Sequence, residues 1–128
     1  MSDYGFVKTV SGTLEEVEQK VRAALEGEKF GVLVRIDMAA KLKEKLAVDM
    51  DEYVILGACN PPNAHKAVTV EPDVGLLLPC NVIIRRRQNE TVVGVIRPTV
   101  AMQMVDNQEL RQVADAVEQK LRRVFDAL

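Results

Sequence analysis

The stretch Cys80-Asn-Val-Ile-Ile-Arg-Arg-Arg-Gln-Asn-Glu-Thr-Val-Val-Gly-Val-Ile96 decides the fold, because it holds two apolar runs separated by a very short polar connection. Residues 80–86 and 91–96 are rich in Val and Ile, which is typical of strands. A parallel crossover needs about a dozen residues or more, and residues 88–90 are too few. We therefore expect an antiparallel hairpin, which argues against a Rossmann-type fold.

Three more strands are expected before this hairpin. Their β-branched or loosely alternating runs cover residues 4–10, 32–36 and 53–58. The run 76–78 reads as an early part of the fourth strand, interrupted near Pro79. The third strand is almost continuously hydrophobic, which indicates a central position in the sheet.

Helical segments alternate with these strands. A capping box of Thr13 and Glu16 predicts the start of the first helix, and Asp37 is expected to cap a shorter one that runs through Leu46. Residues 63–70 read as a third, short helix after two prolines, and Pro98 is expected to open a further helical turn.

The strongest helical periodicity lies at the C-terminus. A second capping box, formed by Asp106 and Glu109, is expected to open this helix. Its apolar residues fall on one face: Leu110, Val113, Ala114, Val117, Leu121, Val124, Phe125 and Leu128. Together the elements predict a single α+β domain over residues 1–128, a two-layer sandwich with a mainly antiparallel five-stranded sheet and helices on one face.

The composition and charge of the chain argue against two kinds of function, nucleic-acid binding and membrane association. A formal net charge of −2 and a pI near 5.5 provide no basic footprint, so nucleic-acid binding is not expected. No apolar run approaches the length of a membrane span, and the first residues lack the pattern of a signal peptide. We therefore expect a cytoplasmic protein without membrane association, whose two cysteines are reduced thiols.

Two Cys-Asn pairs mark the candidate site. Cys59-Asn60 ends the third strand, and Cys80-Asn81 begins the fourth. His65 lies between them, as do Glu71 and Asp73. If the strand ends bring both sulfurs into one water-accessible hollow, Cys59, Cys80 and His65 are candidate zinc or iron ligands, although one cysteine on each arm departs from the usual paired spacing of structural sites.

Two other interpretations use the same residues. Cys59 could be a nucleophile with His65 as its base, assisted by the amides at the start of the helix near residue 63. Alternatively, both cysteines are packed in the core, and Asn60 and Asn81 serve turn amides through side-chain hydrogen bonds. The frequency of Asn in turns favours the structural interpretation of the two asparagines.

Several strings resemble one known family. The strings Ile36-Asp-Met-Ala-Ala-Lys-Leu-Lys-Glu-Lys-Leu46, Leu56-Gly-Ala-Cys-Asn-Pro61 and Leu76-Leu-Leu-Pro-Cys-Asn-Val82 closely resemble the bacterial and archaeal family called domain of unknown function 302. The resemblance implies a TATA-binding-protein-like fold, often dimeric, with no established activity. Ala47 stands where the family usually has a helix-ending glycine.

The resemblance also singles out recurrent polar positions. These fall on Asp37, Cys59, Asn60, Pro61, Pro79, Cys80 and Asn81. Asp37 thereby joins Cys59, Asn60, His65, Cys80 and Asn81 as a candidate binding residue.

Three functions remain open from the sequence. The first is a non-catalytic homodimeric module that binds a small molecule or a metal ion. The second is a cysteine-dependent thiol or redox enzyme using Cys59. The third is a purely structural or interaction protein. The sequence indicates no particular cofactor.

Overall fold

The computed structural model describes residues 3–128. Their order along the chain is β1 (Gly5–Val10), α1 (Leu14–Gly27), β2 (Gly31–Asp37), α2 (Met38–Leu46), β3 (Tyr53–Cys59), α3 (Pro61–Val70), the 3₁₀ helix η1 (Pro72–Leu77), β4 (Cys80–Arg87), β5 (Glu90–Ile96), α4 (Pro98–Ala101) and α5 (Gln108–Asp126). No helix within this range is both long and apolar enough to cross a membrane.

All five strands form one antiparallel sheet, with the order β1-β5-β4-β3-β2. The expected hairpin is confirmed, because β4 pairs with β5 up to Arg87 opposite Glu90. The predicted α+β class is also confirmed, and β3 is an interior strand that pairs on both sides, although β4 is the middle strand of the sheet. The edges of the sheet are β1 and β2.

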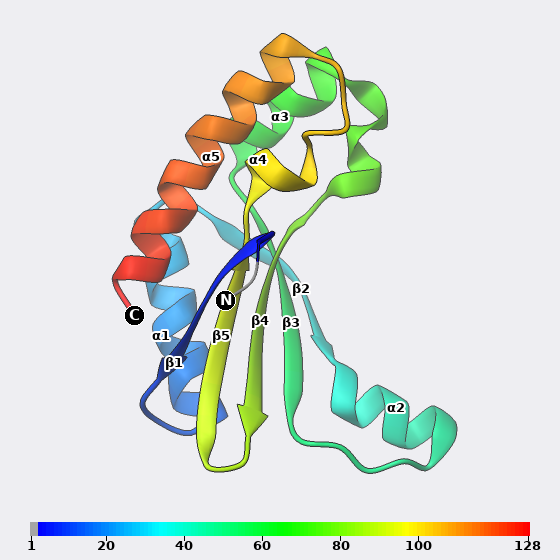
Figure 1. Ribbon diagram of the computed structural model, residues 1–128, viewed down its shortest axis with the longest axis vertical. Helices are drawn as coiled ribbons and strands as arrows, with labels where there is room; N and C mark the ends of the chain where they lie inside the picture. Colours follow the sequence, from blue (N-terminus) through cyan, green and yellow to red (C-terminus); the bar gives the residue numbers. More distant parts are fainter. Residues whose placement is uncertain (1–2) are drawn as a thin grey trace.

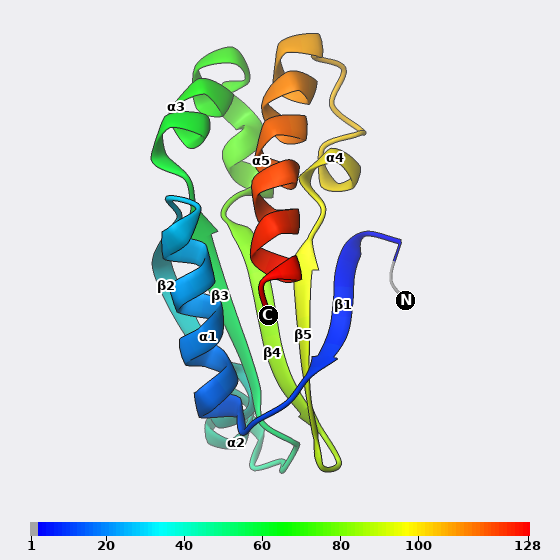
Figure 2. The same ribbon diagram turned by 90° about the vertical axis from the view of Figure 1, so that its left-hand side faces the viewer.

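The helices α1 and α5 cover one face of the sheet, and α2 projects on the other side (Figures 1 and 2). The main core lies between the sheet and this helical layer. Its fully buried aliphatic side chains include Val17, Val21, Leu25, Leu56, Val82, Ile84, Val93 and Leu121. A second apolar cluster joins α3, η1 and α5 at one end of the sheet, around Ala67, Val74, Met102, Leu110 and Ala114.

The first helix begins where the sequence predicts. The Thr13 hydroxyl accepts a hydrogen bond from the Glu16 amide at 3.2 Å, and the Glu16 carboxylate accepts one from the Thr13 amide at 2.9 Å. Further along α1, the buried carboxylate of Glu18 pairs with Arg22 and with Arg35 of β2. Burial alone would raise the pKa of Glu18, but the hydrogen bonds from both guanidinium groups outweigh it and lower the pKa. This ion pair network fixes α1 to the edge strand.

Three boundary predictions are wrong. The helix α3 begins at Pro61 and not at residue 63, because proline is tolerated in the first turn of a helix. Asn107, and not Asp106, is the N-cap of α5, since its Oδ1 accepts from the Leu110 amide at 3.1 Å. Residues 76–78 do not begin β4, because Leu76 and Leu77 belong to η1 and β4 starts only at Cys80. The Leu78–Pro79 peptide bond is cis and lies between the two elements.

Ala47 is the C-cap of α2. It adopts a left-handed conformation with φ of 55° and ψ of 31°. Glycine takes this conformation without strain, whereas alanine does not. The helix therefore ends where the family usually places glycine.

Gly57 is required by close packing on the face of the sheet opposite α1 and α5, which we call the open face. A Cβ atom at this position would lie 2.6 Å from Cγ1 of Val34 and 2.7 Å from Cγ of Pro79. The sequence suggests a bulge at Gly57 or the close approach of another backbone. The irregularity lies instead in the neighbouring strand β2, between Val32 and Val34, and the groups that approach Gly57 are the side chains of Val34 and Pro79.

We expect Gly57→Ala to lower the free energy of unfolding by about 1–3 kcal/mol, because two rigid side chains must move. Gly31→Ala is the matched control, since Gly31 lies on the paired strand and nothing is within 4 Å of its added Cβ. Urea denaturation of both variants measures the difference. Equal stability of the two variants would contradict the packing described for Gly57.

Candidate functional site

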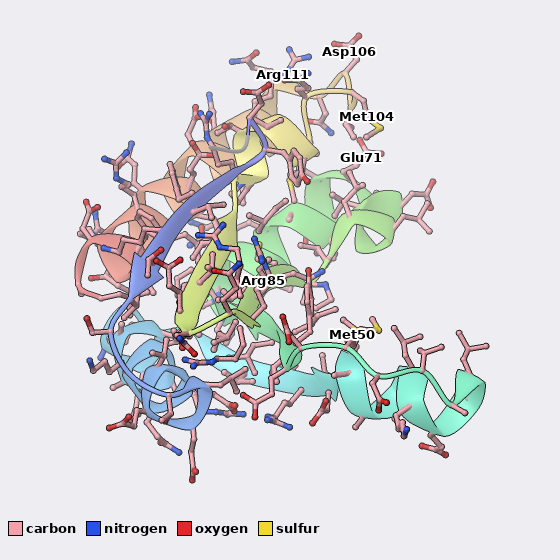
Figure 3. The ribbon with its side chains drawn as sticks, turned by 60° about the horizontal axis from the view of Figure 1, so that its bottom comes forward. Met50, Glu71, Arg85, Met104, Asp106 and Arg111 are labelled. Carbon is pink, nitrogen blue, oxygen red and sulfur yellow. The ribbon has the colours of Figure 1, made fainter. Side chains whose placement is uncertain are left out.

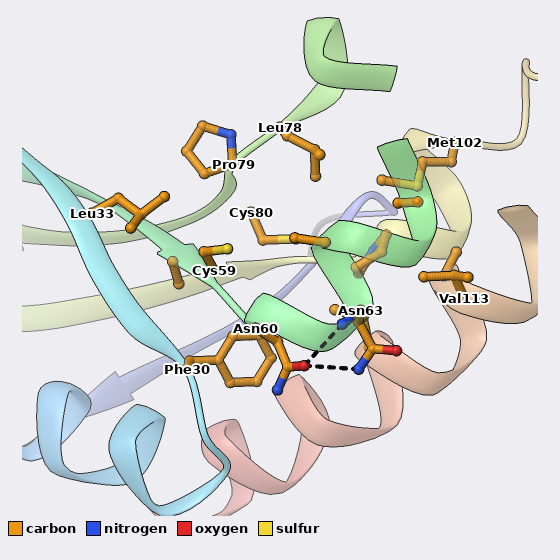
Figure 4. A pocket seen from close by; sticks show the side chains of 16 residues that line it. Phe30, Leu33, Cys59, Asn60, Asn63, Leu78, Pro79, Cys80, Met102 and Val113 are labelled. Atoms are coloured by element: carbon orange, nitrogen blue, oxygen red, sulfur yellow. Dashed lines mark hydrogen bonds between the residues drawn. The ribbon is translucent and has the colours of Figure 1, made fainter. Parts of the chain in front are cut away.

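An apolar cavity of about 260 Å³ lies at the end of the sheet where β3 ends and β4 begins (Figure 4). The helices α3 and α5 form two of its walls. Its lining residues are Phe30, Leu33, Ala58, Cys59, Asn60, Asn63, Ala64, Ala67, Leu78, Pro79, Cys80, Pro98, Met102, Val113, Ala114 and Val117. None of these side chains carries a formal charge, apart from the titratable thiols.

The cavity is partly open to solvent. The side chain of Leu33 is 68% exposed, and those of Cys59 and Asn63 are half-buried. Ala67, Ala114 and Met102 are buried and lie on the helical side. A small molecule could therefore enter past the edge strand β2 and end against the helices.

Asn60 holds the corner between β3 and α3. Its Oδ1 accepts from the Asn63 backbone amide at 3.4 Å and from the Asn63 side chain at 2.9 Å. Its Nδ2 donates to the carbonyls of Glu28 and Lys29 at 3.3 and 3.4 Å. The expectation that Asn60 serves turn and helix-end groups is confirmed, and its amide is fully engaged within the protein.

Asn107 does the same for the other helical wall, and the sequence analysis missed it. Besides capping α5, its Nδ2 donates to the Val70 carbonyl at 2.9 Å and to the Glu71 carboxylate at 3.0 Å. The start of α5 is thereby fixed to the end of α3. An N-cap Asn is recognisable in a sequence, but its distant partners are not.

Both cysteines line the cavity as free thiols (Figure 4). Ala58 pairs with Cys80 across β3 and β4, so Cys59 lies one residue beyond that pair. Burial, together with the nearby Cys59, raises the pKa of Cys80 from 9.0 to about 11. Cys80 is therefore a neutral thiol at physiological pH, and thiolate chemistry is disfavoured there.

The other sequence candidates lie elsewhere. His65 is exposed on α3, and no hydrogen bond joins it to either thiol in the described residues. Asn81 is exposed and lines a groove on the open face of the sheet. Asp37 caps α2 through the Ala40 amide at 2.9 Å. It is six residues along β2 from Gly31, which pairs with Cys59, and this is roughly 20 Å at the usual rise per residue.

Cys59, Asn60 and Cys80 are thus the only candidates named from the sequence that surround the cavity. Glu71 is engaged by Asn107, and Asp73 is exposed on η1. Within residues 3–128, no group of three or more His, Cys, Asp or Glu side chains is arranged to hold a metal ion. The structure therefore does not gather Cys59, Cys80 and His65 into the metal site considered from the sequence.

The comparisons with known proteins concern the whole chain. The model of the family described as Domain of unknown function DUF302 matches residues 6–128. The chain therefore belongs to this family of small α+β proteins.

A solved structure is similar to the chain throughout. It is the crystal structure of an uncharacterized conserved DUF302 protein from Bacillus stearothermophilus, with 28% sequence identity, a TM-score of 0.91 and coverage of 98% of both chains. No curated protein matches the chain. The family resemblance read from the Cys-Asn strings is thus confirmed. Neither the family nor the similar structure is described with an activity.

Cys80 makes the stability of the protein dependent on alkaline pH. The unfolded chain releases the thiol proton near pH 9, whereas the folded protein retains it until about pH 11. The native state binds more protons between these values, so its stability is complete below pH 9 and falls as the pH rises to 11. We expect the wild type to lose about 2–3 kcal/mol more than Cys80→Ala over this interval, since one pKa unit corresponds to about 1.4 kcal/mol.

Urea denaturation at several pH values measures this difference. Comparison with Cys80→Ala removes the contributions of lysine and tyrosine, which titrate in the same range. Parallel stability curves for the two proteins would contradict a buried neutral thiol.

We expect Asn60→Ala to cost about 2–3 kcal/mol, because it removes the cap of α3 and the donor to two carbonyls. The matched control is Asn63→Ala, which loses only one side-chain hydrogen bond and is expected to cost less than about 1 kcal/mol. Thermal and urea denaturation provide the comparison. Equal costs for both variants would refute the role assigned to Asn60.

Proposed function

We propose that this DUF302 protein is a non-catalytic binding module that takes a small, uncharged, mainly apolar ligand in the cavity between the strand ends and the helices α3 and α5. The uncharged lining of that cavity is the observation that supports the proposal most directly. We also propose that the module acts as a homodimer, as the family resemblance implies. Ligand sites in proteins are concave and mainly apolar, with a few polar groups that orient the ligand.

The size of the cavity limits the ligand. An engineered apolar cavity of about 150 Å³ holds one benzene molecule. The cavity here measures about 260 Å³. A bicyclic aromatic compound or a branched aliphatic molecule of similar bulk therefore fits. A charged ligand would lose its hydration without finding an opposite charge in the lining.

The thiols favour binding over catalysis. A cysteine nucleophile needs a base or a nearby cation that stabilises the thiolate. His65 is not among the residues that line the cavity, and neither are lysine or arginine residues. Neutral Cys80 can instead contribute a polarisable apolar surface and a weak hydrogen-bond donor.

Indole is a suitable test ligand, because it is neutral, bicyclic and water-soluble. Protein labelled with ¹³C in its methionine methyl groups reports binding at Met102, which lines the cavity. Met104 is 76% exposed and serves as the internal reference. We expect a saturable shift of the Met102 signal with a dissociation constant on the order of 0.1–1 mM, given the small number of ligand atoms.

Filling the cavity should block binding. Ala114→Leu adds three carbon atoms to the α5 wall and is expected to weaken indole binding about tenfold. Ala116→Leu is the matched control, because Ala116 is exposed on the same helix, and its affinity should stay within about twofold of the wild type. A Met102 signal that does not respond to indole, or equal binding by both variants, would refute the proposal.

A further inference from the structure

A groove of about 800 Å³ crosses the open face of the sheet beside the edge strand β1. Its walls and floor come from β1, β3, β4 and β5. None of the residues that line this groove also lines the cavity of the proposed function. The groove is therefore a separate place on the molecule, and its volume lies within the range of about 300–1,000 Å³ that ligand sites occupy.

The middle of the groove is a smooth apolar strip. Val7, Gly94 and Ile83 are cross-strand neighbours on β1, β5 and β4, and all three line the groove. Gly94 has no side chain above the sheet. Ile83 leans over it instead, since a Cβ added to Gly94 would lie 2.9 Å from Cγ1 of Ile83. A flat apolar group can rest on this strip without meeting a projecting side chain.

One end of the groove carries a guanidinium group without a partner. Arg85 is half-buried there, and no ion pair or hydrogen bond of its side chain is present in residues 3–128. Every other arginine in that range has an ion pair or a side-chain hydrogen bond. The five N–H donors of Arg85 are therefore available to a molecule that enters the groove.

The other charges at the groove favour an anion at this same end. Arg87 also lines the groove, but Glu90 lies 3.1 Å from it and offsets its charge. Asp3 is the one carboxylate among the described lining residues, and it lies near the start of β1. Four residues of β5 separate the partner of Gly5 from the partner of Arg85, which is roughly 13 Å at the usual rise. An anion is thus attracted to Arg85 and repelled at the opposite end.

We propose that this groove binds a small organic carboxylate with a flat apolar body, its carboxylate paired with Arg85 and its body on the strip of Val7, Gly94 and Ile83. A guanidinium group binds a carboxylate through two parallel hydrogen bonds, which fixes the orientation of the ligand as well as its charge. Tyr53 is the cross-strand neighbour of Arg85 and also lines the groove, so its hydroxyl adds a further donor. This site goes beyond the proposed function, whose cavity takes an uncharged ligand, and does not depend on it.

The probe 2-naphthoate tests the site, because it is anionic at neutral pH and has a flat bicyclic body. In ¹⁵N-labelled protein the Gly94 amide reports binding in the groove, and the ¹³C methyl signal of Met102 reports the separate cavity. We expect a saturable shift of the Gly94 signal with a dissociation constant on the order of 1 mM, while the Met102 signal stays unchanged. The uncharged amide of the same shape, 2-naphthamide, should bind in the groove at least about tenfold more weakly.

A pair of arginine variants makes the test specific. Arg85→Gln should weaken naphthoate binding at least about tenfold, because it removes both the charge and the paired donors. Arg111→Gln removes the same charge from α5, outside the groove, and should leave the affinity within about twofold. Figure 3 shows Arg111 near the start of α5, away from Arg85. A dispersed ¹H–¹⁵N spectrum checks that each variant is folded.

Three results would overturn the site in folded protein. They are a Gly94 signal that does not respond to naphthoate, equal affinities of the Arg85→Gln and Arg111→Gln variants, and naphthamide binding in the groove as tightly as naphthoate. Indole binding at Met102 is measured separately, so the failure of this site and the failure of the proposed function are distinguishable.

Discussion

The buried side-chain amide of Asn60 is the constraint on which the cavity depends. A buried amide must satisfy both its donor and its acceptor, and Asn60 does so with groups from two separate segments. It caps α3 and binds the carbonyls of the turn between α1 and β2. Asn107 fixes the start of α5 to the end of α3 in the same way. Because both helical walls are held at their ends, neither is free to slide inward and close the space between them.

The sheet and the long helices follow from local sequence signals. The short connection at residues 88–90 requires an antiparallel hairpin, and the capping box at Thr13 gives the start of α1. The start of α5, in contrast, does not follow from the local sequence alone. Asp106 and Asn107 are equally good caps by residue type, and the choice depends on the carbonyl of Val70 and the carboxylate of Glu71, which lie far away in the sequence. Such contacts are invisible to a local pattern.

The candidate site was predictable only in part, because contacts between distant segments decide which side chains line the cavity. Both cysteines line the cavity because it lies where β3 ends and β4 begins, although the register pairs Cys80 with Ala58 and not with Cys59. Asn81 is the next residue after Cys80, so strand alternation turns it to the open face. His65 faces solvent because α3 presents Ala64 and Ala67 to the cavity instead. Seven of the sixteen lining residues lie on α3, on α5 or at Met102, and the six apolar ones among them resemble ordinary core positions in the sequence.

The cavity and the open face occupy different parts of one sheet. The cavity lies at the strand ends and is closed by helices of the same chain, whereas the open face spans the middle of all five strands and is not covered by α1 or α5 (Figures 1 and 2). Leu33 on the edge strand belongs to the rim of the cavity and is largely exposed.

The central claim is that the space between the strand ends and the helices α3 and α5 stays open and accepts an apolar guest. A crystal structure determined under xenon pressure tests it most directly, because xenon occupies dry apolar cavities without needing a polar group. We expect xenon density beside Met102, Ala67 and Ala114, with α3 unmoved. A cavity without xenon, or one filled by an inward shift of α3, would contradict it.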